Sequence, residues 1–417
     1  MDFKEHLKSY LDNDEIDKLI SSIGSKEHKG LYLNTKKLSC EQFKKMFPHV
    51  SAHPIVPNAF LYDQDEYQFG KMIYHDLGCY YIIDPSACLV SYFLSNKPAL
   101  DVLDMCAAPG GKSIVYSLLK DEKCILYSND LSHSRANILL ENVERLGLGN
   151  VVITSLDLAK KNELQNRFDA IILDAPCSGS GMFNKLEAMR DDWTIEKVKK
   201  ASIIQKQLIL LAYSFLKEGG TMVYSTCSYS KEEDEDVVNY LLDNSDAVLE
   251  DIPDCPMFYR SSYMKKAIHL FPTHFVGEGH FIAMIKKPGN LLLRSSDSSY
   301  ISSRSSKGKG KEMIKYNFLL PFSPIKELEK VSIRPGLLTN YEIGKNEFIS
   351  YHYSHYLAAN NAYELSDDEL KKYMHGETIN INNGKNYNLV SYNNINIGPV
   401  KTSGSTLKNL YPKKLRY

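Results

Sequence analysis

The sequence predicts a doubly wound α/β fold with a mostly parallel sheet, flanked by a smaller domain at each end. Its main support is a series of short apolar runs, at residues 100–105, 124–130, 151–157, 168–176 and 219–227. These runs are rich in β-branched residues, which is typical of parallel strands covered on both faces. Helix-length segments such as residues 134–147 separate them, as the crossover connections of a parallel sheet require.

The flanking segments have other patterns. Residues 1–95 combine an amphipathic start with short apolar runs, so we expect a small α+β domain there and the α/β domain at 96–290. Residues 291–312 are rich in Ser, Gly and Lys without apolar periodicity, which predicts a flexible linker. In residues 313–417, short alternating runs are interrupted by Gly, Asn and Pro, which predicts a small β-rich domain.

The composition indicates an ordinary globular protein, with 43% hydrophobic and 24% charged residues. The acidic start lacks the apolar segment of a signal peptide, and no run approaches the ~18 apolar residues of a membrane helix. We therefore expect a cytoplasmic monomer without membrane contact. The eight cysteines never form Cys-x-x-Cys and the twelve histidines never form His-Glu-x-x-His, so we expect neither a disulfide framework nor a metal.

Charge is unevenly distributed along the chain. The formal net charge is −1, but residues 287–417 hold 19 Lys and Arg against 11 Asp and Glu, and the rest of the chain is acidic. Such asymmetry favours contact between the C-terminal region and a polyanion. A merely solvated surface is the simpler alternative.

The segment DMCAAPGGKS, residues 104–113, follows a predicted strand and opens a predicted helix. Backbone N–H groups at such a turn hold charged or polar ligands. A phosphate-binding loop, and with it a nucleotide hydrolase using Lys112 and Ser113, would need Gly where Cys106 stands, and G-x-G-x-x-G is absent. The remaining interpretation of this segment is the less strictly defined glycine turn of a methyltransferase.

Acidic residues end the next two predicted strands. Asp130 lies 19 residues after Gly111, where a doubly wound cofactor site places an acid on ribose hydroxyls. Asp157 ends the following strand, where it can accept a hydrogen bond from an adenine amino group. Each acid taken alone is equally consistent with a helix N-cap.

Two cysteines follow the last two strands. The segment ILDAPCSGSG places Asp174 and Cys177 at one strand end, and YSTCS places Cys227 at the next. A single cysteine there is more often an inert apolar residue, but two in polar, turn-like settings favour a nucleophile and a helper. A thiolate can add to C6 of cytosine and activate C5 for methylation, a carboxylate can hold the N3 proton, and a second base can remove the C5 proton.

These three motifs, in this order, resemble the Nop2/Sun family of RNA cytosine-5 methyltransferases. The resemblance implies a Rossmann-like class I methyltransferase that uses S-adenosylmethionine, with Cys227 as nucleophile, Cys177 assisting product release, and Lys112 near the reacting base. It also implies a set of residues lining the cofactor: Cys106, Ala107, Ala108, Pro109, Gly110, Gly111, Lys112, Asp130, Arg135, Asp157 and Asp174. DNA cytosine-5 methyltransferases match less well, because their nucleophile is the Pro-Cys residue.

Further stretches resemble the bacterial F-type 16S ribosomal RNA cytosine-5 methyltransferases: GLYLNT, GCYYIIDPSA, GMFNK, DDW, GEGHFIA and LKNLYPKKLR. That resemblance implies an RNA-binding N-terminal domain, a PUA-like RNA-binding region at the C-terminus, and small-subunit ribosomal RNA or the small ribosomal subunit as partner. Asp130 departs from it, since many relatives have Glu there. Transfer RNA as substrate and a vestigial core in an RNA-binding assembly factor are the alternatives. The acids of KEEDEDVV, residues 231–238, are interpreted as helix N-terminal residues without a catalytic role.

Overall fold

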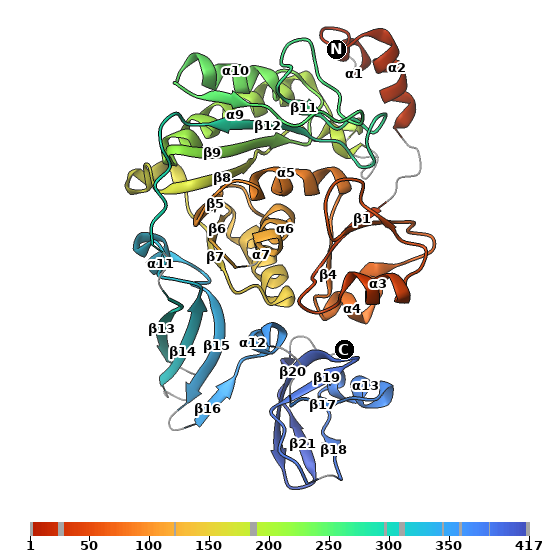
Figure 1. Ribbon diagram of the computed structural model, residues 1–417, viewed down its shortest axis with the longest axis vertical. Helices are drawn as coiled ribbons and strands as arrows, with labels where there is room; N and C mark the ends of the chain where they lie inside the picture. The colour runs from red at the N-terminus through yellow and green to blue at the C-terminus, as the bar shows by residue number, and fades with distance from the viewer. Residues whose placement is uncertain are drawn as a thin grey trace.

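The computed structural model describes residues 3–23, 29–120, 122–183, 190–295, 298–307, 313–343, 346–357, 361–382 and 384–413. The central α/β part and the β-rich C-terminal part follow each other along the longest axis, and the N-terminal sheet lies beside the central part (Figure 1). Within the described residues, no helix is both long and apolar enough to cross a bilayer.

The central sheet has the strand order β10-β12-β9-β8-β5-β6-β7, and β11 pairs with β12. Its strands are β5 (Asp101–Asp104), β6 (Ile125–Asn129), β7 (Val151–Thr154), β8 (Phe168–Asp174), β9 (Leu216–Thr226), β10 (Val248–Glu250), β11 (Ile268–His269) and β12 (Phe281–Lys286). Strands β5 to β9 are parallel, and β12 runs antiparallel to β9. Each predicted apolar run forms one parallel strand, so the predicted doubly wound fold is confirmed.

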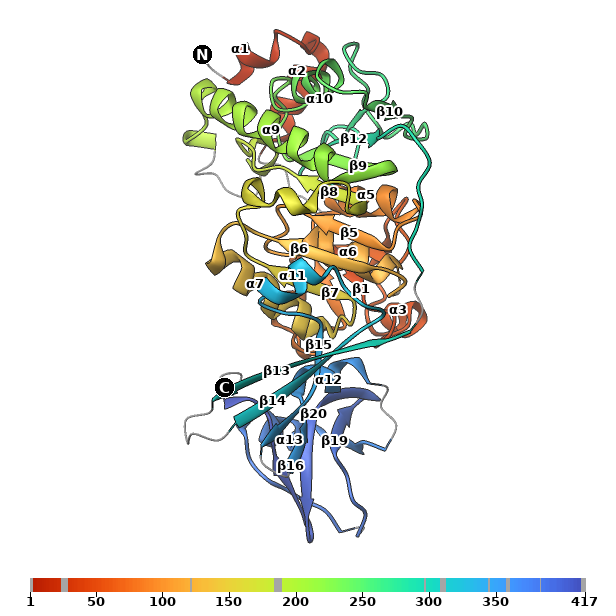
Figure 2. The same ribbon diagram turned by 90° about the vertical axis from the view of Figure 1, so that its left-hand side faces the viewer.

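Helices cover both faces of this sheet (Figure 2). They are α5 (Pro85–Ser95), α6 (Gly111–Lys120), α7 (His133–Leu146), α9 (Ile195–Phe215) and α10 (Glu235–Asp243), with 3₁₀ turns η2 (Leu158–Lys160), η3 (Asn162–Leu164) and η4 (Ser180–Met182). Alternate strand residues point to opposite faces. Val102 therefore packs in the cluster that contains residues of α5, α6 and α7, and Leu103 packs in the cluster that contains residues of α9 and α10.

The N-terminal sheet is antiparallel, with the order β2-β3-β1-β4. Its elements are β1 (Lys29–Leu33), α3 (Cys40–Met46), β2 (Ser51–Ala52), β3 (Ala59–Tyr62), η1 (Phe69–Lys71), α4 (Ile73–Asp76) and β4 (Tyr80–Ile82). The first two helices, α1 (Phe3–Leu7) and α2 (Asn13–Ser22), lie apart from it at the top of Figure 1. The Tyr10 hydroxyl donates to the Tyr229 carbonyl at 2.5 Å, which ties these helices to the central domain.

Two further sheets form the C-terminal part, which agrees with the β-rich prediction. The elements are β13 (Tyr300–Lys307), β14 (Met313–Leu320), α11 (Lys326–Val331), β15 (Leu337–Ile343), β16 (Asn346–Ile349), α12 (Tyr351–Tyr356), β17 (Tyr363–Glu364), α13 (Asp367–His375), β18 (Ile379–Asn380), β19 (Leu389–Tyr392), β20 (Ile395–Ser403) and β21 (Thr406–Asn409).

The segment 291–312 is not a flexible linker throughout. Strand β13 lies within it and pairs along its whole length with β14. The pairing uses backbone groups, so it does not require the apolar periodicity whose absence suggested a linker. Residues 296–297 and 308–312 lie outside the described residues.

One buried arginine connects this C-terminal part to the central sheet through hydrogen bonds and an ion pair. Arg334 is 2% exposed and donates to the carbonyls of Leu148 (2.7 Å) and Val151 and to the Glu144 carboxylate. Its own carbonyl accepts from the Ile153 amide at 2.9 Å, at the edge strand β7. Burial alone would raise the pKa of Glu144, but Arg334 and His352 lower it to about 2.

Replacing Arg334 with Ala should destabilise the protein strongly, because Glu144 would keep its charge without its main partner. Loss of one member of a buried ion pair costs about 3–5 kcal/mol, so thermal unfolding should show a clearly lower melting temperature. Arg167→Ala, at an exposed site, is the control. Adding Glu144→Gln to Arg334→Ala should recover part of the loss. An unchanged melting temperature in Arg334→Ala would contradict this role.

Candidate active site

The predicted cofactor loop lies where the strand order reverses. Strand β5 has β6 on one side and β8 on the other, and such a switch point is where doubly wound sheets bind ligands. The loop continues from β5 through Cys106, Ala107, Ala108, Pro109 and Gly110 into α6, which begins at Gly111 and contains Lys112. Gly110 has φ +121°, and a Cβ there would meet Leu139 Cδ1 at 3.0 Å, so only glycine suits this position.

The buried base of this loop is polar. Asp104 is fully buried at the end of β5, and its Oδ2 accepts from the Ser113 hydroxyl at 2.7 Å. Burial raises the pKa of Asp104 to about 7. The Ser113 hydroxyl also lies 2.7 Å from that of Ser128, so Ser113 links β5, α6 and β6 under the loop.

Asp130 and Arg135 reach the same loop from β6 and α7. Arg135 donates to the Ala108 carbonyl at 2.6 Å, and its Nη1 lies 3.5 Å from Asp130 Oδ2. The Asp130 side chain is 4% exposed, and its Oδ2 accepts no hydrogen bond from a described residue. An acceptor of this kind fits a ribose hydroxyl, so these residues suit a nucleoside cofactor. Asp157 is more exposed and caps η2 by accepting from the Ala159 amide.

Lys112 and Asp174 form an ion pair across the switch point. Lys112 Nζ lies 2.7 Å from Asp174 Oδ2, and the other oxygen of Asp174 accepts from the Ser225 hydroxyl at 2.7 Å. Burial alone would lower the pKa of Lys112 and raise that of Asp174. Their interaction reverses both effects, so the pKa of Lys112 lies above its ordinary value and that of Asp174 below. Both groups remain charged at neutral pH.

His280 joins this pair from the loop before β12. Its Nε2 lies 3.3 Å from Lys112 Nζ, and its Nδ1 lies 2.9 Å from the Ser86 hydroxyl. Burial and the Lys112 charge lower the pKa of His280 to about 4, so the ring is neutral and accepts from Lys112. The sequence reasoning missed His280, because a single histidine within GEGHFIA carries no recognisable ligand spacing.

The two predicted cysteines lie together. Cys177 follows β8, Cys227 follows β9, and their sulfur atoms are 2.9 Å apart as free thiols. The hydrogen bond with Cys227, followed by burial, raises the pKa of Cys177 well above its ordinary value. Both side chains are partly exposed, so a ligand at the carboxyl edge of the sheet can reach them.

Glu233 connects the two loops that carry Cys177 and Cys227. Its buried carboxylate accepts from the Ser178 amide (2.8 Å), the Ser228 hydroxyl (2.8 Å) and the Gln205 side chain (3.0 Å). The acids of residues 231–238 were expected only to begin a helix. Helix α10 does begin at Glu235, but Glu233 also positions the residues beside Cys177 and Cys227, which the capping interpretation did not foresee.

Asp234, Glu235 and His269 form a buried group whose ligand atoms lie within 4.8 Å of one another, as a metal site would require. Hydrogen bonds already engage some of these ligand atoms. Thr226 donates to Asp234 at 2.5 Å, and His269 Nε2 lies 3.0 Å from Glu235 Oε1. The group supports the end of β9 through Thr226, the residue before Cys227.

Comparison with known proteins places the chain in a family. Residues 91–286 match a family described as 16S rRNA methyltransferase RsmB/F. Residues 1–85 match the N-terminal domain of 16S rRNA methyltransferase RsmF, and residues 360–417 match the methyltransferase RsmF PUA domain. The PUA match therefore begins after the sheet β13–β16.

Individual relatives agree. The ribosomal RNA small subunit methyltransferase F of Shewanella piezotolerans is 29% identical over 92% of this chain and 90% of its own length. The tRNA (cytosine(49)-C(5))-methyltransferase of Pyrococcus abyssi is 33% identical over 69% of this chain and 100% of its own. A solved structure of a methyltransferase homolog protein from Pyrococcus horikoshii is 28% identical, with a TM-score of 0.60 over 68% of this chain and 93% of that one.

The fold and these matches define an RNA cytosine-5 methyltransferase that uses S-adenosylmethionine. More narrowly, the chain belongs to the RsmB/F family of 16S rRNA methyltransferases and has the RsmF-type N-terminal and PUA domains. The resemblance seen in the sequence is thereby confirmed.

Glu233→Ala should lower kcat for methyl transfer by at least tenfold, because the Ser178 amide loses its acceptor and the Gln205 side chain keeps only the Pro176 carbonyl of its two described acceptors. An unsatisfied buried group costs about 1–3 kcal/mol, enough to displace the cysteine loops. The KM for S-adenosylmethionine should stay within twofold, since the described hydrogen bonds of the Glu233 carboxylate go to Ser178, Ser228 and Gln205, which lie outside the cofactor loop. Glu233→Gln should lose less, and Glu141→Ala, on the exposed face of α7, nothing. Full kcat in Glu233→Ala would refute the positioning role.

Proposed function

We propose that the protein methylates C5 of a cytosine in 16S ribosomal RNA through a covalent adduct between Cys227 and C6 of the base. The observation that carries the proposal is the pair of thiols 2.9 Å apart, at neighbouring strand ends beside the Lys112–Asp174 ion pair. A methyltransferase acting on oxygen or on an exocyclic amine needs no thiol nucleophile. Methylation at C5 does, because that carbon becomes nucleophilic only after addition at C6.

In the first step Cys227 gives up its proton and forms a C–S bond to C6, the electron pair of the C5–C6 double bond moves toward N3, and N3 gains a proton, so that the charges balance. Asp174 stabilises this step, since a carboxylate near N3 accepts a hydrogen bond from the N3 proton. Lys112 keeps Asp174 ionised through the 2.7 Å ion pair. S-adenosylmethionine supplies an electrophilic methyl group, and residues 106–112 with Asp130, Arg135 and Asp157 would hold it.

Cys177 serves the second half of the reaction. After C5 has taken the methyl group, its proton must leave, and the electron pair of the C5–H bond restores the double bond as the C6–S bond breaks. Cys177 lies against the sulfur that must depart, so it can accept the C5 proton in its thiolate form. The same proximity allows Cys177 to return a proton to Cys227.

Ribosomal RNA is favoured over transfer RNA as the substrate, because the ribosomal RNA enzyme matches a larger part of this chain. The ribosomal enzyme of Shewanella piezotolerans matches 92% of this chain, whereas the transfer RNA enzyme of Pyrococcus abyssi matches 69%. The basic balance after residue 287 and the PUA match provide a surface for a polyanion. Bisulfite mapping of ribosomal and transfer RNA from cells lacking the gene tests this: one or more 16S positions should lose methylation, and loss only in transfer RNA would refute the assignment.

Because the two cysteines have different roles in the proposed reaction, their substitutions should have different effects. Cys177→Ala should accumulate a covalent RNA–protein adduct, because the adduct forms but resolves slowly. Cys227→Ala should abolish both methylation and adduct. Denaturing gel electrophoresis with labelled 16S RNA reads the adduct, and Cys255→Ala is the matched control because no role in the reaction is assigned to this cysteine. Full activity in Cys227→Ala would show that another group is the nucleophile.

A further inference from the structure

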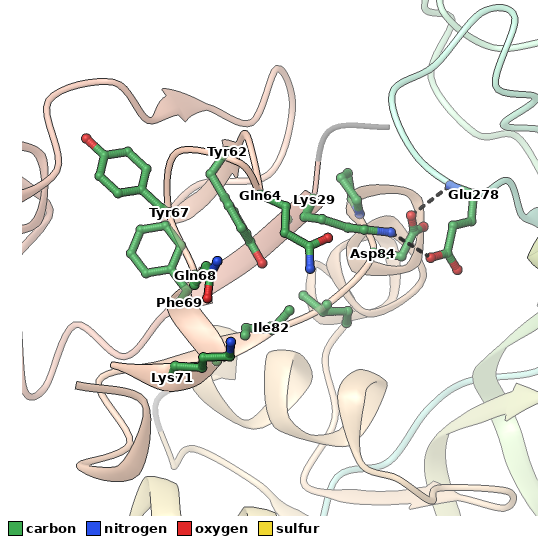
Figure 3. Close-up of a pocket in the computed structure, with 14 residues that line it drawn as sticks. Lys29, Tyr62, Gln64, Tyr67, Gln68, Phe69, Lys71, Ile82, Asp84 and Glu278 are labelled. Atoms are coloured by element: carbon green, nitrogen blue, oxygen red, sulfur yellow. Dashed lines mark hydrogen bonds and ion pairs between the residues drawn. The ribbon is translucent and has the colours of Figure 1, made fainter. Parts of the chain in front are cut away.

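The N-terminal sheet carries a cavity of about 550 Å³ that the reaction just described does not use (Figure 3). It is lined by residues of β1, β3, η1 and β4, by the start of α5, and by Glu278 from the loop before β12. Ligand pockets commonly have volumes of roughly 300–1,000 Å³, so the space suits one nucleotide.

The chemistry of the lining is that of a nucleotide site. Two tyrosine rings line it: Tyr67 is partly exposed and Tyr62 is largely buried, and Figure 3 shows Tyr62 between Tyr67 and Gln64. Gln64 and Gln68 are exposed amides, which can both donate to and accept from the edge of a base. RNA-binding proteins recognise unstacked bases by this combination of aromatic and amide groups.

Charged side chains lie at both ends of the cavity, and they differ between the ends. Lys71 lies at one end and the Asp84–Glu278 pair at the other, as Figure 3 shows. Asp84 accepts from the Glu278 backbone amide at 2.7 Å, and Lys29 Nζ lies 3.7 Å from the Glu278 carboxylate. Lys71 attracts a phosphate to its end, whereas at the other end Lys29 offsets the Glu278 charge and the Asp84 carboxylate repels a phosphate. The amino groups of a base are suited to the acids.

The acidic end connects directly to the active site. Asp84 accepts from the Ser86 hydroxyl, which lies 2.9 Å from His280 Nδ1. His280 in turn contacts Lys112 at 3.3 Å. Side-chain contacts through Ser86 and His280 thus connect the cavity to the Lys112–Asp174 pair, and an RNA strand with one base at Cys227 would pass close to the cavity.

We propose that this cavity binds an unstacked nucleotide that flanks the target cytosine, with its base between the tyrosines and glutamines and its phosphate toward Lys71. The proposal rests on the proposed function, since the nucleotide must belong to the methylated RNA. The site anchors the strand beside the target base and contributes to the choice of cytosine.

The test is methyl transfer to 16S RNA from cells lacking the gene, with the full-length protein. The variant is Gln64→Ala with Gln68→Ala. Both side chains are exposed, and Gln68 makes no side-chain cap to η1, so folding should persist. We expect the KM for RNA to rise about tenfold, with kcat and the KM for S-adenosylmethionine within twofold. Lys71→Ala should also raise the KM for RNA, and Gln165→Ala and Lys45→Ala, exposed outside the cavity, are the controls.

A second readout separates a nucleotide site from general RNA contact. Ultraviolet cross-linking of the wild-type complex at 254 nm, followed by nuclease digestion and mass spectrometry, should find a nucleotide on a peptide from residues 59–71. The proposal is overturned if the KM for RNA of the double variant stays within twofold of the controls, or if it rises without any adduct on those peptides. A wild-type protein that transfers no methyl group to 16S RNA would instead refute the proposed function.

Discussion

The ion pair between Lys112 and Asp174 is the interaction on which the rest of the site depends. It joins the first turn of α6, after the cofactor loop, to the end of β8, where the cysteine loop begins. Two charges taken out of water are costly unless each is paired and hydrogen-bonded. Here Ser225 and His280 supply the additional contacts. The arrangement therefore fixes the loop that precedes α6 and the loop that carries Cys177 relative to each other.

Supporting contacts extend this constraint outward in two directions. On the sheet side, Glu233 links the residues after Cys177 and Cys227, so the two thiols remain in contact. On the N-terminal side, Asp84 binds the loop before β12, and a Cβ on Gly277 would lie 2.8 Å from Asp84 Oδ2. Gly277 has φ +141°, a further reason for glycine. The N-terminal sheet is thereby held against the active site.

The sequence was sufficient for the parts that depend on local pattern. Buried strands of the parallel sheet are marked by continuous apolar runs, and the cysteines could be placed because both directly follow such strands. Residues whose roles arise from long-range contacts could not be found in this way. His280 meets Lys112 across 168 residues, and Arg334 reaches Glu144 across 190, without any local spacing that signals the contact. Glu233 was assigned to a helix start, and β13 to a linker, because only the folded chain reveals their partners.

In the proposed reaction Cys227, and not Cys177, attacks the base. The most direct test of this assignment uses 16S RNA in which cytidine is replaced by 5-fluorocytidine, with the wild-type protein and S-adenosylmethionine. Fluorine at C5 leaves no proton to remove, so the adduct cannot resolve. Digestion and tandem mass spectrometry should then identify a methylated fluorocytidine nucleotide on the peptide that contains Cys227. A nucleotide attached to Cys177, or the absence of any adduct, would contradict the account.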